Sequence, residues 1–224
     1  MEELLKNNIL YEDNHIIVVH KIANIPSCPD SSKDKDLLTI LKEYIKIKYN
    51  KPGNVYLGLV HRLDRPTEGV MVYAKTSKAA ERLSKQIANN LFHKTYYAVC
   101  EGITKDKETL KDYLYKDELT NTSYISNKDK GKLAILEYET IKTKNNLSLI
   151  KINLLTGRHH QIRVQLSNIS HPLYGDHKYN KNFLSDNKTN LSLVAKELSF
   201  YHPTTKELLH FEIDLPKKYP YTLF

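Results

Sequence analysis

Residues 60–76 read VHRLDRPTEGVMVYAKT, and their order predicts two extended segments joined by a turn. The run Gly69–Lys75 (GVMVYAK) is rich in β-branched and aromatic residues, which is typical of a strand. Residues 56–63 are expected to be extended as well, and the turn at residues 65–67 contains a proline. The stretch therefore predicts a β-rich fold in which polar residues collect at the end of a strand.

Asp64 lies at that strand end, with His61 and Arg62 before it and Arg65 after it. Cationic neighbours favour the ionised form of a carboxylate. An ionised carboxylate in a basic surround suits attack on an electron-poor carbon of an anionic substrate. The pattern alone also fits a turn aspartate that accepts backbone hydrogen bonds and pairs with Arg65. A nucleophile and a structural turn residue are therefore both open interpretations of this position.

The rest of the chain continues the alternation of apolar and polar residues. Further strands are expected at residues 16–21, 95–101, 133–142, 147–155, 191–201 and 207–215. Helices are expected at residues 37–49, at residues 77–90 with Ser77 as the cap, and at residues 158–168. Polar loops are expected at residues 105–130, with some strand character at 110–115, and at residues 180–190, the latter mobile.

The expected strands outnumber the helices and mostly follow one another in hairpins. This order predicts an α+β fold on a mixed, mainly antiparallel central sheet with flanking helices and an active-site cleft. No convincing linker and no internal repeat divides the 224 residues. We therefore expect a single domain over residues 1–224.

A second motif, residues 154–166, reads LLTGRHHQIRVQL and gathers basic and amide side chains at the expected start of a helix. These side chains belong to Arg158, His159, His160, Gln161 and Arg163. Backbone amides at a helix N-terminus, together with arginines, form a natural phosphate or carboxylate site. A solvated basic helix is the alternative interpretation.

A zinc site is disfavoured, although four histidines lie in or after this motif: His159, His160, His171 and His177. The first two are adjacent and are expected to point apart on a helix, and no acid or cysteine completes a plausible set. The two cysteines of the chain are far apart and form no CxxC pair. We therefore expect neither a metal site nor a disulfide framework.

A third motif, residues 94–102, reads KTYYAVCEG and places Tyr96 and Tyr97 next to each other on a strand. Successive side chains of a strand point to opposite faces, so one tyrosine faces inward and the other outward. Taken alone, this pattern fits two ordinary tyrosines of a sheet.

The three motifs, in this order, resemble those of the RluA-type pseudouridine synthases. The family pattern has HRLD, an apolar strand and AKT, followed by KxYxA, TGRxHQIR and hPxxGD. This chain has HRLDRPTEGVMVYAKT, KTYYAVCEG, TGRHHQIRVQL and HPLYGDHKY, and its opening LYEDNHIIVVHK is similar too. The resemblance covers residues 9–215 and implies an RNA pseudouridine synthase, in which Asp64 is more than a turn residue.

The resemblance also implies roles for individual residues. Asp64 corresponds to the nucleophile, Tyr96 to a tyrosine that stacks on the target base and handles a proton, and Arg163 to an arginine that pairs with the aspartate. Residues expected to bind the RNA substrate are His61, Arg62, Lys94, Arg158, His160 and Gln161. An aspartate kept ionised by an arginine is a competent nucleophile, and a tyrosine offers both an aromatic face and a hydroxyl.

The implied reaction detaches uracil from C1′ of its ribose and rejoins it through C5. Because atoms are conserved, no cofactor is expected. The base must first leave its stack, which favours uridines that are already unpaired. Asp64 either attacks C1′ directly or assists elimination across C1′–C2′, and both routes remain open.

Several positions depart from the family pattern. Residues 20–24 read HKIAN where NKPAG is usual, so a proline and a glycine are missing. Pro66 stiffens the turn, Glu68 replaces a common serine, His159 a threonine and Gln165 a histidine. These departures bear on the substrate more than on the reaction. We also expect no N-terminal S4-like RNA-binding domain, which many relatives carry.

Composition agrees with an RNA partner but does not require one. The formal net charge is +8, which favours polyanions, although abundant lysine is also expected from an AT-rich genome. No apolar run reaches the ~18 residues that a membrane helix needs, and no secretory signal opens the chain, so a cytoplasmic monomer is expected. Ribosomal and transfer RNA are both open as substrates.

Two other functions remain to be weighed. One is a non-catalytic RNA-binding or ribosome-assembly protein on the same scaffold, which would not require Asp64, Tyr96 and Arg163 together. The other is a carboxylate-dependent glycosidase, which needs two acids about 5–10 Å apart. Glu68 is the one acid near the motifs, so the glycosidase is disfavoured.

Overall fold

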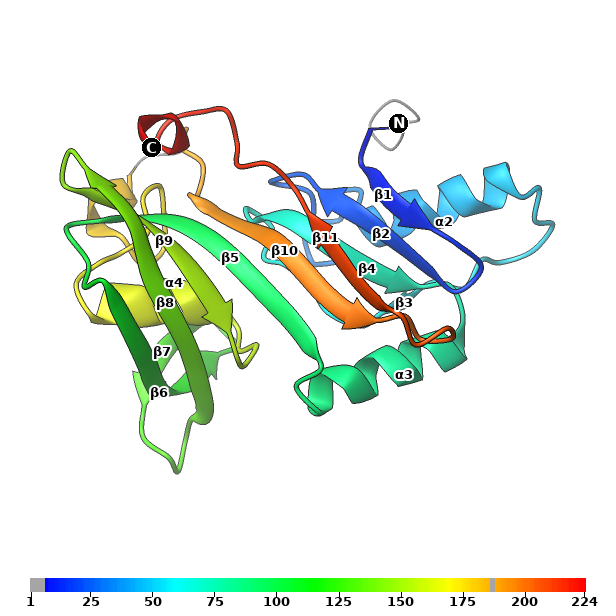
Figure 1. The fold of residues 1–224 in the computed structure, drawn as a ribbon, viewed down its shortest axis with the longest axis horizontal. Helices are drawn as coiled ribbons and strands as arrows, with labels where there is room; N and C mark the ends of the chain where they lie inside the picture. The colour runs from blue at the N-terminus through cyan, green and yellow to red at the C-terminus, as the bar shows by residue number, and fades with distance from the viewer. Residues whose placement is uncertain (1–6, 186–187) are drawn as a thin grey trace. The chain divides into compact units, whose positions relative to one another are not determined.

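A computed structural model of the chain describes residues 7–185 and 188–224 (Figure 1). The described residues divide into two compact units. The first unit runs up to His93 and includes Ala195–Ile213, and the second consists of Lys94–Val194 and Asp214–Phe224. Within these described ranges there are eleven strands and three α-helices. The expected α+β fold on a mainly antiparallel sheet is confirmed.

The first unit contains the strands on either side of the Asp64 turn. Its strands are β1 (Ile9–Glu12), β2 (Ile16–Lys21), β3 (Gly58–Leu59), β4 (Glu68–Ala74), most of β10 (Leu193–Tyr201) and β11 (Leu208–Glu212). They follow the order β1-β2-β4-β10, with β11 on β10 and β3 on β4. The expected strands at residues 16–21 and 69–75 are confirmed, whereas only Gly58–Leu59 of residues 56–63 is a strand.

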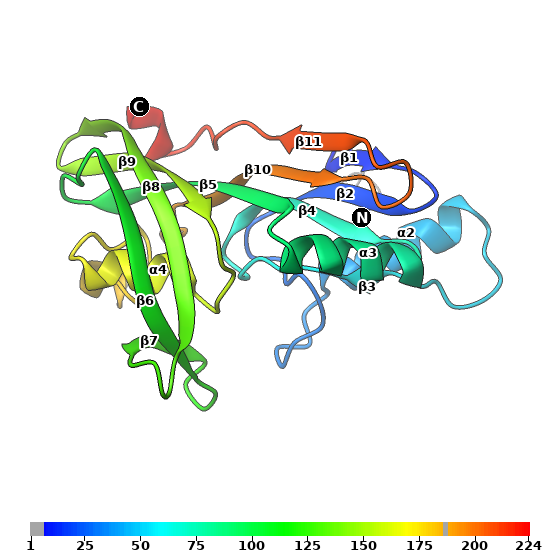
Figure 2. The same ribbon diagram turned by 60° about the horizontal axis from the view of Figure 1, so that its bottom comes forward.

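Two helices cover one side of these strands, as Figure 2 shows: α2 (Leu37–Lys48) and α3 (Ser77–Ala88). Asp36 caps the α2 helix, and its side chain accepts a hydrogen bond from the backbone N of Thr39. The prediction that Ser77 caps α3 is wrong. Thr76 is extended and its hydroxyl accepts from the backbone N of Ala79, so the cap lies one residue earlier.

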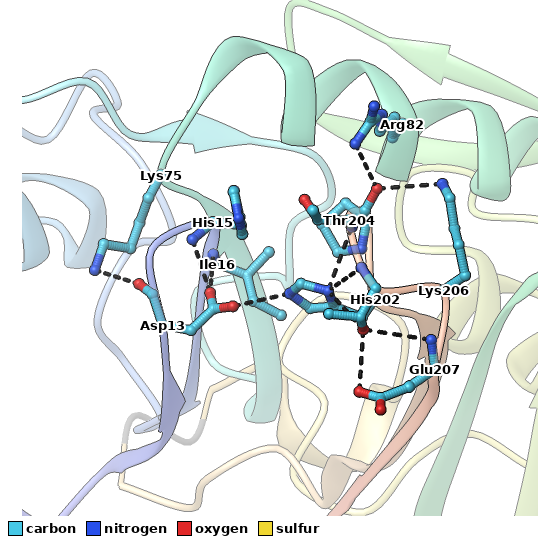
Figure 3. A network of polar contacts seen from close by, with 11 residues as sticks. Asp13, His15, Ile16, Lys75, Arg82, His202, Thr204, Lys206 and Glu207 are labelled. Carbon is cyan, nitrogen blue, oxygen red and sulfur yellow. Dashed lines mark hydrogen bonds and ion pairs between the residues drawn. The ribbon is translucent and has the colours of Figure 1, made fainter.

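The strand ends of the first unit are tied together by a polar network around Asp13 and His202 (Figure 3). One Asp13 carboxylate oxygen accepts from the backbone N of His15 and of Ile16, both at 2.8 Å. The other lies 2.9 Å from Nε2 of His202, and Lys75 donates to the Asp13 carbonyl. The turn between β1 and β2 is thereby joined to the turn between β10 and β11.

The second unit holds the remaining strands and the third helix. Its strands are the larger part of β5 (Phe92–Glu101), then β6 (Lys107–Asp117), β7 (Thr122–Ser126), β8 (Lys132–Lys144) and β9 (Leu147–Leu154). They pair antiparallel in the order β5-β9-β8-β6-β7. The α4 helix (Gln161–Asn168) packs on β6 and β7, and two short 3₁₀ helices follow, η1 (Lys181–Phe183) and η2 (Tyr221–Leu223).

Two expectations for the second unit are corrected. Residues 105–130 were expected to be mainly a loop, but they form the β6–β7 hairpin, with Leu110 and Leu114 buried on one face. The helix expected at residues 158–168 begins only at Gln161, because His160 takes a left-handed conformation. Of the expected loop at residues 180–190, part is η1, and residues 186–187 lie outside the described part of the chain.

Candidate active site

The Asp64 turn is built into the first unit between β3 and β4. Leu63 is buried, and both its backbone N and its carbonyl bond to the hydroxyl of Ser27, at 3.2 and 2.8 Å. One residue later, the carbonyl of Asp64 accepts from the backbone N of Thr67 at 3.0 Å and closes the turn. Asp64 is itself half-buried. The turn therefore holds a carboxylate between two fixed points of the backbone.

Lys21 also anchors this turn, through a hydrogen bond to the carbonyl of Arg65. No sequence motif singled out this lysine. Its side chain is fully buried, and its ammonium donates to the carbonyls of Ile22, Ile25 and Arg65 at 2.8–3.2 Å. Burial lowers the pKa of Lys21 to about 7, although the carboxylates of Asp64 and Glu68 raise it in part. A carbonyl at the Asp64 turn is thus tied to the end of β2.

The departure from NKPAG at residues 20–24 has a structural explanation. Asn24 has φ 69°, a left-handed conformation that glycine adopts freely and asparagine tolerates best among the other residues. Its backbone N donates to the Arg65 carbonyl at 2.8 Å. Asparagine therefore replaces the missing glycine and keeps a contact with the Asp64 turn.

The basic residues around Asp64 differ in their surroundings. Nε2 of His61 accepts from the backbone N of Val72 at 3.1 Å, and its ring lies against Phe92 with centroids 5.1 Å apart. His61 therefore supports the segment leading to the turn. Arg62 is exposed, whereas Arg65 forms an ion pair with Asp34. Exposure leaves Arg62 accessible to a polyanion.

Tyr96 and Lys94 lie on β5 in the second unit. Tyr96 is 6% exposed and stands opposite Ile152 of β9, while its neighbour Tyr97 is only half-buried, as the alternation of a strand predicts. Burial lowers the pKa of Lys94. A Cβ added to Gly157 would lie 3.3 Å from the Lys94 ammonium, so the glycine of the TGR motif leaves room for this amine.

Gln161 organises the TGR turn. Its side-chain oxygen accepts from the hydroxyl of Thr156 at 2.8 Å and from the backbone N of Arg158 at 3.0 Å. The side chain of Arg158 is exposed and donates through Nε to the carbonyl of Leu133. The side-chain nitrogen of Gln161 is buried and has no hydrogen-bond partner among the described residues.

The adjacent histidines do not point apart, contrary to our expectation. The rings of His159 and His160 stack with centroids 3.7 Å apart, because His160 precedes the helix with φ 53°. Nδ1 of His160 lies 2.8 Å from the Tyr179 hydroxyl, and Nδ1 of His159 lies 2.9 Å from the Ser123 hydroxyl. Both rings are therefore tied into the second unit by side-chain hydrogen bonds.

Arg163 is buried on α4, so the alternative of a solvated basic helix is wrong at this residue. The Arg163 side chain is 6% exposed and that of Asp176 is 0% exposed. Nε and Nη2 of the arginine donate to the two carboxylate oxygens of Asp176 at 2.8 and 2.7 Å. Asp176 was not singled out from the sequence, although the GD of the quoted motif HPLYGDHKY contains it.

The predicted catalytic residues come from both units. Asp64 belongs to the first unit, and Tyr96 and Arg163 to the second. The pairing of Asp64 with Arg163 stays a prediction. Across residues 7–185 and 188–224, no three His, Cys, Asp or Glu side chains are grouped to hold a metal ion. In the same ranges, no helix is long and apolar enough to cross a membrane.

The chain matches RNA pseudouridine synthases over most of its length. Residues 15–168 match the family model described as RNA pseudouridylate synthase. An uncharacterized RNA pseudouridine synthase of Aquifex aeolicus is 35% identical over 95% of this chain and 70% of its own length. The ribosomal large subunit pseudouridine synthase D of Haemophilus influenzae is 32% identical over 93% of this chain and 67% of its own length.

A solved structure shares the fold. Human RNA Pseudouridylate Synthase Domain Containing 4 has a TM-score of 0.79 at 21% identity, over 96% of this chain and 91% of the human chain. At this identity the likeness speaks for the fold alone. The family match and the bacterial relatives go further, and they show that this chain belongs to the RluA family of RNA pseudouridine synthases, which are RNA uridine isomerases.

Proposed function

We propose that this chain converts specific uridines of ribosomal or transfer RNA to pseudouridine, with Asp64 as the nucleophile. The observation that carries the proposal is the construction of the Asp64 turn. Ser27 bonds both backbone groups of Leu63, and Lys21 bonds the carbonyl of Arg65, so the aspartate is held from both sides. Such rigid support is typical of a reactive group that must meet its substrate in one geometry.

The proposed roles of Arg163 and Tyr96 rest on their positions in the family motifs, and both residues are buried. Arg163 pairs with Asp64 and keeps its carboxylate ionised, since a guanidinium remains charged in proteins. Asp176 binds Nε and Nη2 of the same guanidinium and holds the arginine in place. Tyr96 presents its ring to the flipped uracil and its hydroxyl to the ribose or the base.

The reaction is balanced without a cofactor. The N1–C1′ bond of uridine breaks, the base rotates, and a C5–C1′ bond forms. The hydrogen of C5 leaves to solvent and N1 takes up a proton, so product and substrate are isomers. Asp64 either bonds to C1′ during the rotation or assists removal of the 2′ proton, and either route needs the carboxylate ionised.

RNA binding is assigned to basic and amide side chains of both units. Arg62 and Arg158 are exposed and suit phosphates, while Lys94 is a partly buried amine beside Gly157. His61 supports the turn, and His160 is held by Tyr179, so both contribute through position. Gln161 contributes through its oxygen, which holds the turn that carries Arg158.

Ribosomal RNA is the first substrate to test, because the Haemophilus influenzae relative is a ribosomal large subunit pseudouridine synthase. The measurement is tritium release from [5-³H]uridine-labelled RNA of cells that lack this protein, with ribosomal and transfer RNA kept apart. We expect release by the wild type and none by Asp64→Asn. Asp30→Asn, an exposed acid of the same unit, is the matched control and should match the wild type.

The competing function is RNA binding or ribosome assembly without catalysis. It predicts that no RNA pool releases tritium, and that Asp64→Asn preserves both RNA binding and any cellular role. The presence of Asp64, Tyr96 and Arg163 together argues against it, because a pure binding role does not require that set.

A further inference from the structure

The guanidinium of Arg163 is held by more than one group. Asp176 binds it through two parallel hydrogen bonds, which fix the plane of the guanidinium as well as its position. The ring of Tyr179 lies beside it, with the guanidinium carbon 5.1 Å from the ring centroid. Both partners belong to the short segment that follows α4. Asp176 and Tyr179 therefore form a cage around the Arg163 guanidinium within the second unit.

The Asp176 carboxylate is fixed independently of the arginine. Its Oδ1 also accepts from the backbone N of Lys178 at 2.9 Å and of Tyr179 at 3.1 Å. Gly175 before it has φ +73°, and a Cβ there would lie 2.2 Å from the Asn190 carbonyl oxygen. Only glycine fits this position, so the backbone itself sets where the carboxylate stands.

The β6–β7 hairpin holds Tyr179 in place. Its hydroxyl accepts from the backbone N of Ser123 at 2.8 Å and shares a hydrogen bond with Nδ1 of His160. The ring also packs against the buried cluster of Leu114, Ala134 and Val164. The tyrosine cannot turn away from the guanidinium without breaking these contacts.

We infer that Asp176 and Tyr179 are positioning residues that set the orientation of the Arg163 guanidinium, and through it that of the catalytic carboxylate. The inference rests on the proposed function of Asp64 and Arg163. Neither residue touches the reacting atoms in this scheme. Loss of the cage should therefore slow the chemical step while RNA binding persists.

The kinetic test measures kcat and KM for tritium release with four variants. Asp176→Asn should lower kcat by up to about a hundredfold, because a small misplacement of a catalytic group can have an effect of that size, with KM little changed. Tyr179→Leu should lower kcat, and Tyr179→Phe, which keeps the ring, should restore much of it. Asp112→Asn is the matched control, because the half-buried Asp112 accepts a hydrogen bond from Gln165, which lies on α4 together with Arg163.

An activity-independent readout separates this inference from the proposed function. The Nε–H signal of Arg163, assigned by its loss in Arg163→Lys, should exchange slowly in nitrogen-15 NMR of the wild type and of Asp112→Asn. It should be lost in Asp176→Asn, or displaced in Tyr179→Leu if Asp176→Asn does not fold. Persistence of the signal in both variants would overturn the inference, even in a protein that releases no tritium.

Two kinetic outcomes would also overturn it. Wild-type kcat in both Asp176→Asn and Tyr179→Leu would mean that the cage does not orient the arginine. A raised KM at unchanged kcat would assign the two residues to RNA binding instead. Failure of Asp64→Asn to abolish tritium release would contradict the proposal that Asp64 is the nucleophile. The NMR result would still test whether Asp176 and Tyr179 orient Arg163.

Discussion

Lys21 shows how a single buried cation can organise a reactive turn. Its ammonium has three carbonyl partners, which belong to Ile22, Ile25 and Arg65. A lysine is rarely buried, because transfer of its charge from water is costly. Here the burial is compensated by these carbonyls and by the nearby carboxylates of Asp64 and Glu68. The residue therefore couples the end of β2 to the turn that carries the nucleophile.

Stability should depend on pH through Lys21. The unfolded chain holds this proton up to its ordinary pKa of 10.5, whereas the folded protein releases it near 7. Between these values the unfolded state binds more protons, so the free energy of unfolding rises with pH in this window. Lys21→Met should remove that rise and cost on the order of 2 kcal/mol by leaving buried carbonyls without donors.

Urea unfolding of both proteins from pH 6.5 to 10 measures this effect. The destabilisation of Lys21→Met should be larger at pH 10 than at pH 6.5. The exposed Lys78 on α3 gives the control, since Lys78→Met should leave the curve unchanged. Parallel curves for wild type and Lys21→Met would contradict the lowered pKa.

Glu12 is a carboxylate that connects several secondary-structure elements of the first unit. It lies on β1 and accepts hydrogen bonds from Tyr44, Lys48, Tyr49 and Lys75, so it joins α2 and the end of β4 to the first strand. Burial alone would raise the pKa of Glu12, but these donors outweigh it and lower the pKa to about 2. The strand and the helix are thus held together by a carboxylate that stays ionised in mild acid.

Acid unfolding should report this junction. The stability that Glu12 contributes is complete above its ordinary pKa of 4.5 and is lost as the pH falls toward 2. Glu12→Gln should therefore cost roughly 2 kcal/mol at pH 7 and flatten the acid limb of the unfolding curve. Glu43→Gln on α2, whose partner is the exposed Lys35, is the control and should do neither. A Glu12→Gln curve that keeps the acid limb of the wild type would refute the assignment.

Elements marked by an apolar pattern within their own segment were predictable from the sequence. Elements that depend on a contact with a residue far away in the chain were not. The strand at residues 16–21 and the helix at residues 37–48 follow from apolar spacing alone. In β6 the inward position between Leu110 and Leu114 is Asp112, which interrupts the apolar pattern. Its partner is Gln165, 53 residues away, and no local pattern reveals such a pair.

In the candidate site too, some residues were predictable from the sequence and others were not. The motifs identified Asp64, Tyr96 and Arg163 because the family resemblance fixes their positions in the chain. They could not identify Lys21, whose three acceptors lie on two separate segments, or the pairing of Asp176 with Arg163. These contacts depend on folded backbone geometry, which spacing in the sequence does not contain.

At the scale of the whole molecule, the net charge of +8 predicts how RNA is bound. Cationic groups release counterions from phosphates, so affinity falls as salt rises. Binding of Asp64→Asn to a substrate RNA should weaken by at least about tenfold between 50 and 200 mM salt. This variant removes turnover while it keeps the basic surface, and fluorescence anisotropy gives the affinity at each salt. An affinity independent of salt would mean that phosphate contacts contribute little.

The first unit is discontinuous in sequence, and this has a consequence for synthesis. Ala195–Ile213 supplies β11 and most of β10, but about a hundred residues of the second unit separate it from β4. A ribosome making this chain releases β1, β2 and β4 long before β10 and β11 exist. The N-terminal strands must therefore wait, with an edge unpaired, while the later unit emerges as an almost continuous piece. The unit that carries Asp64 is therefore the first to be synthesised in part and can be completed only after residues 94–194 have been made.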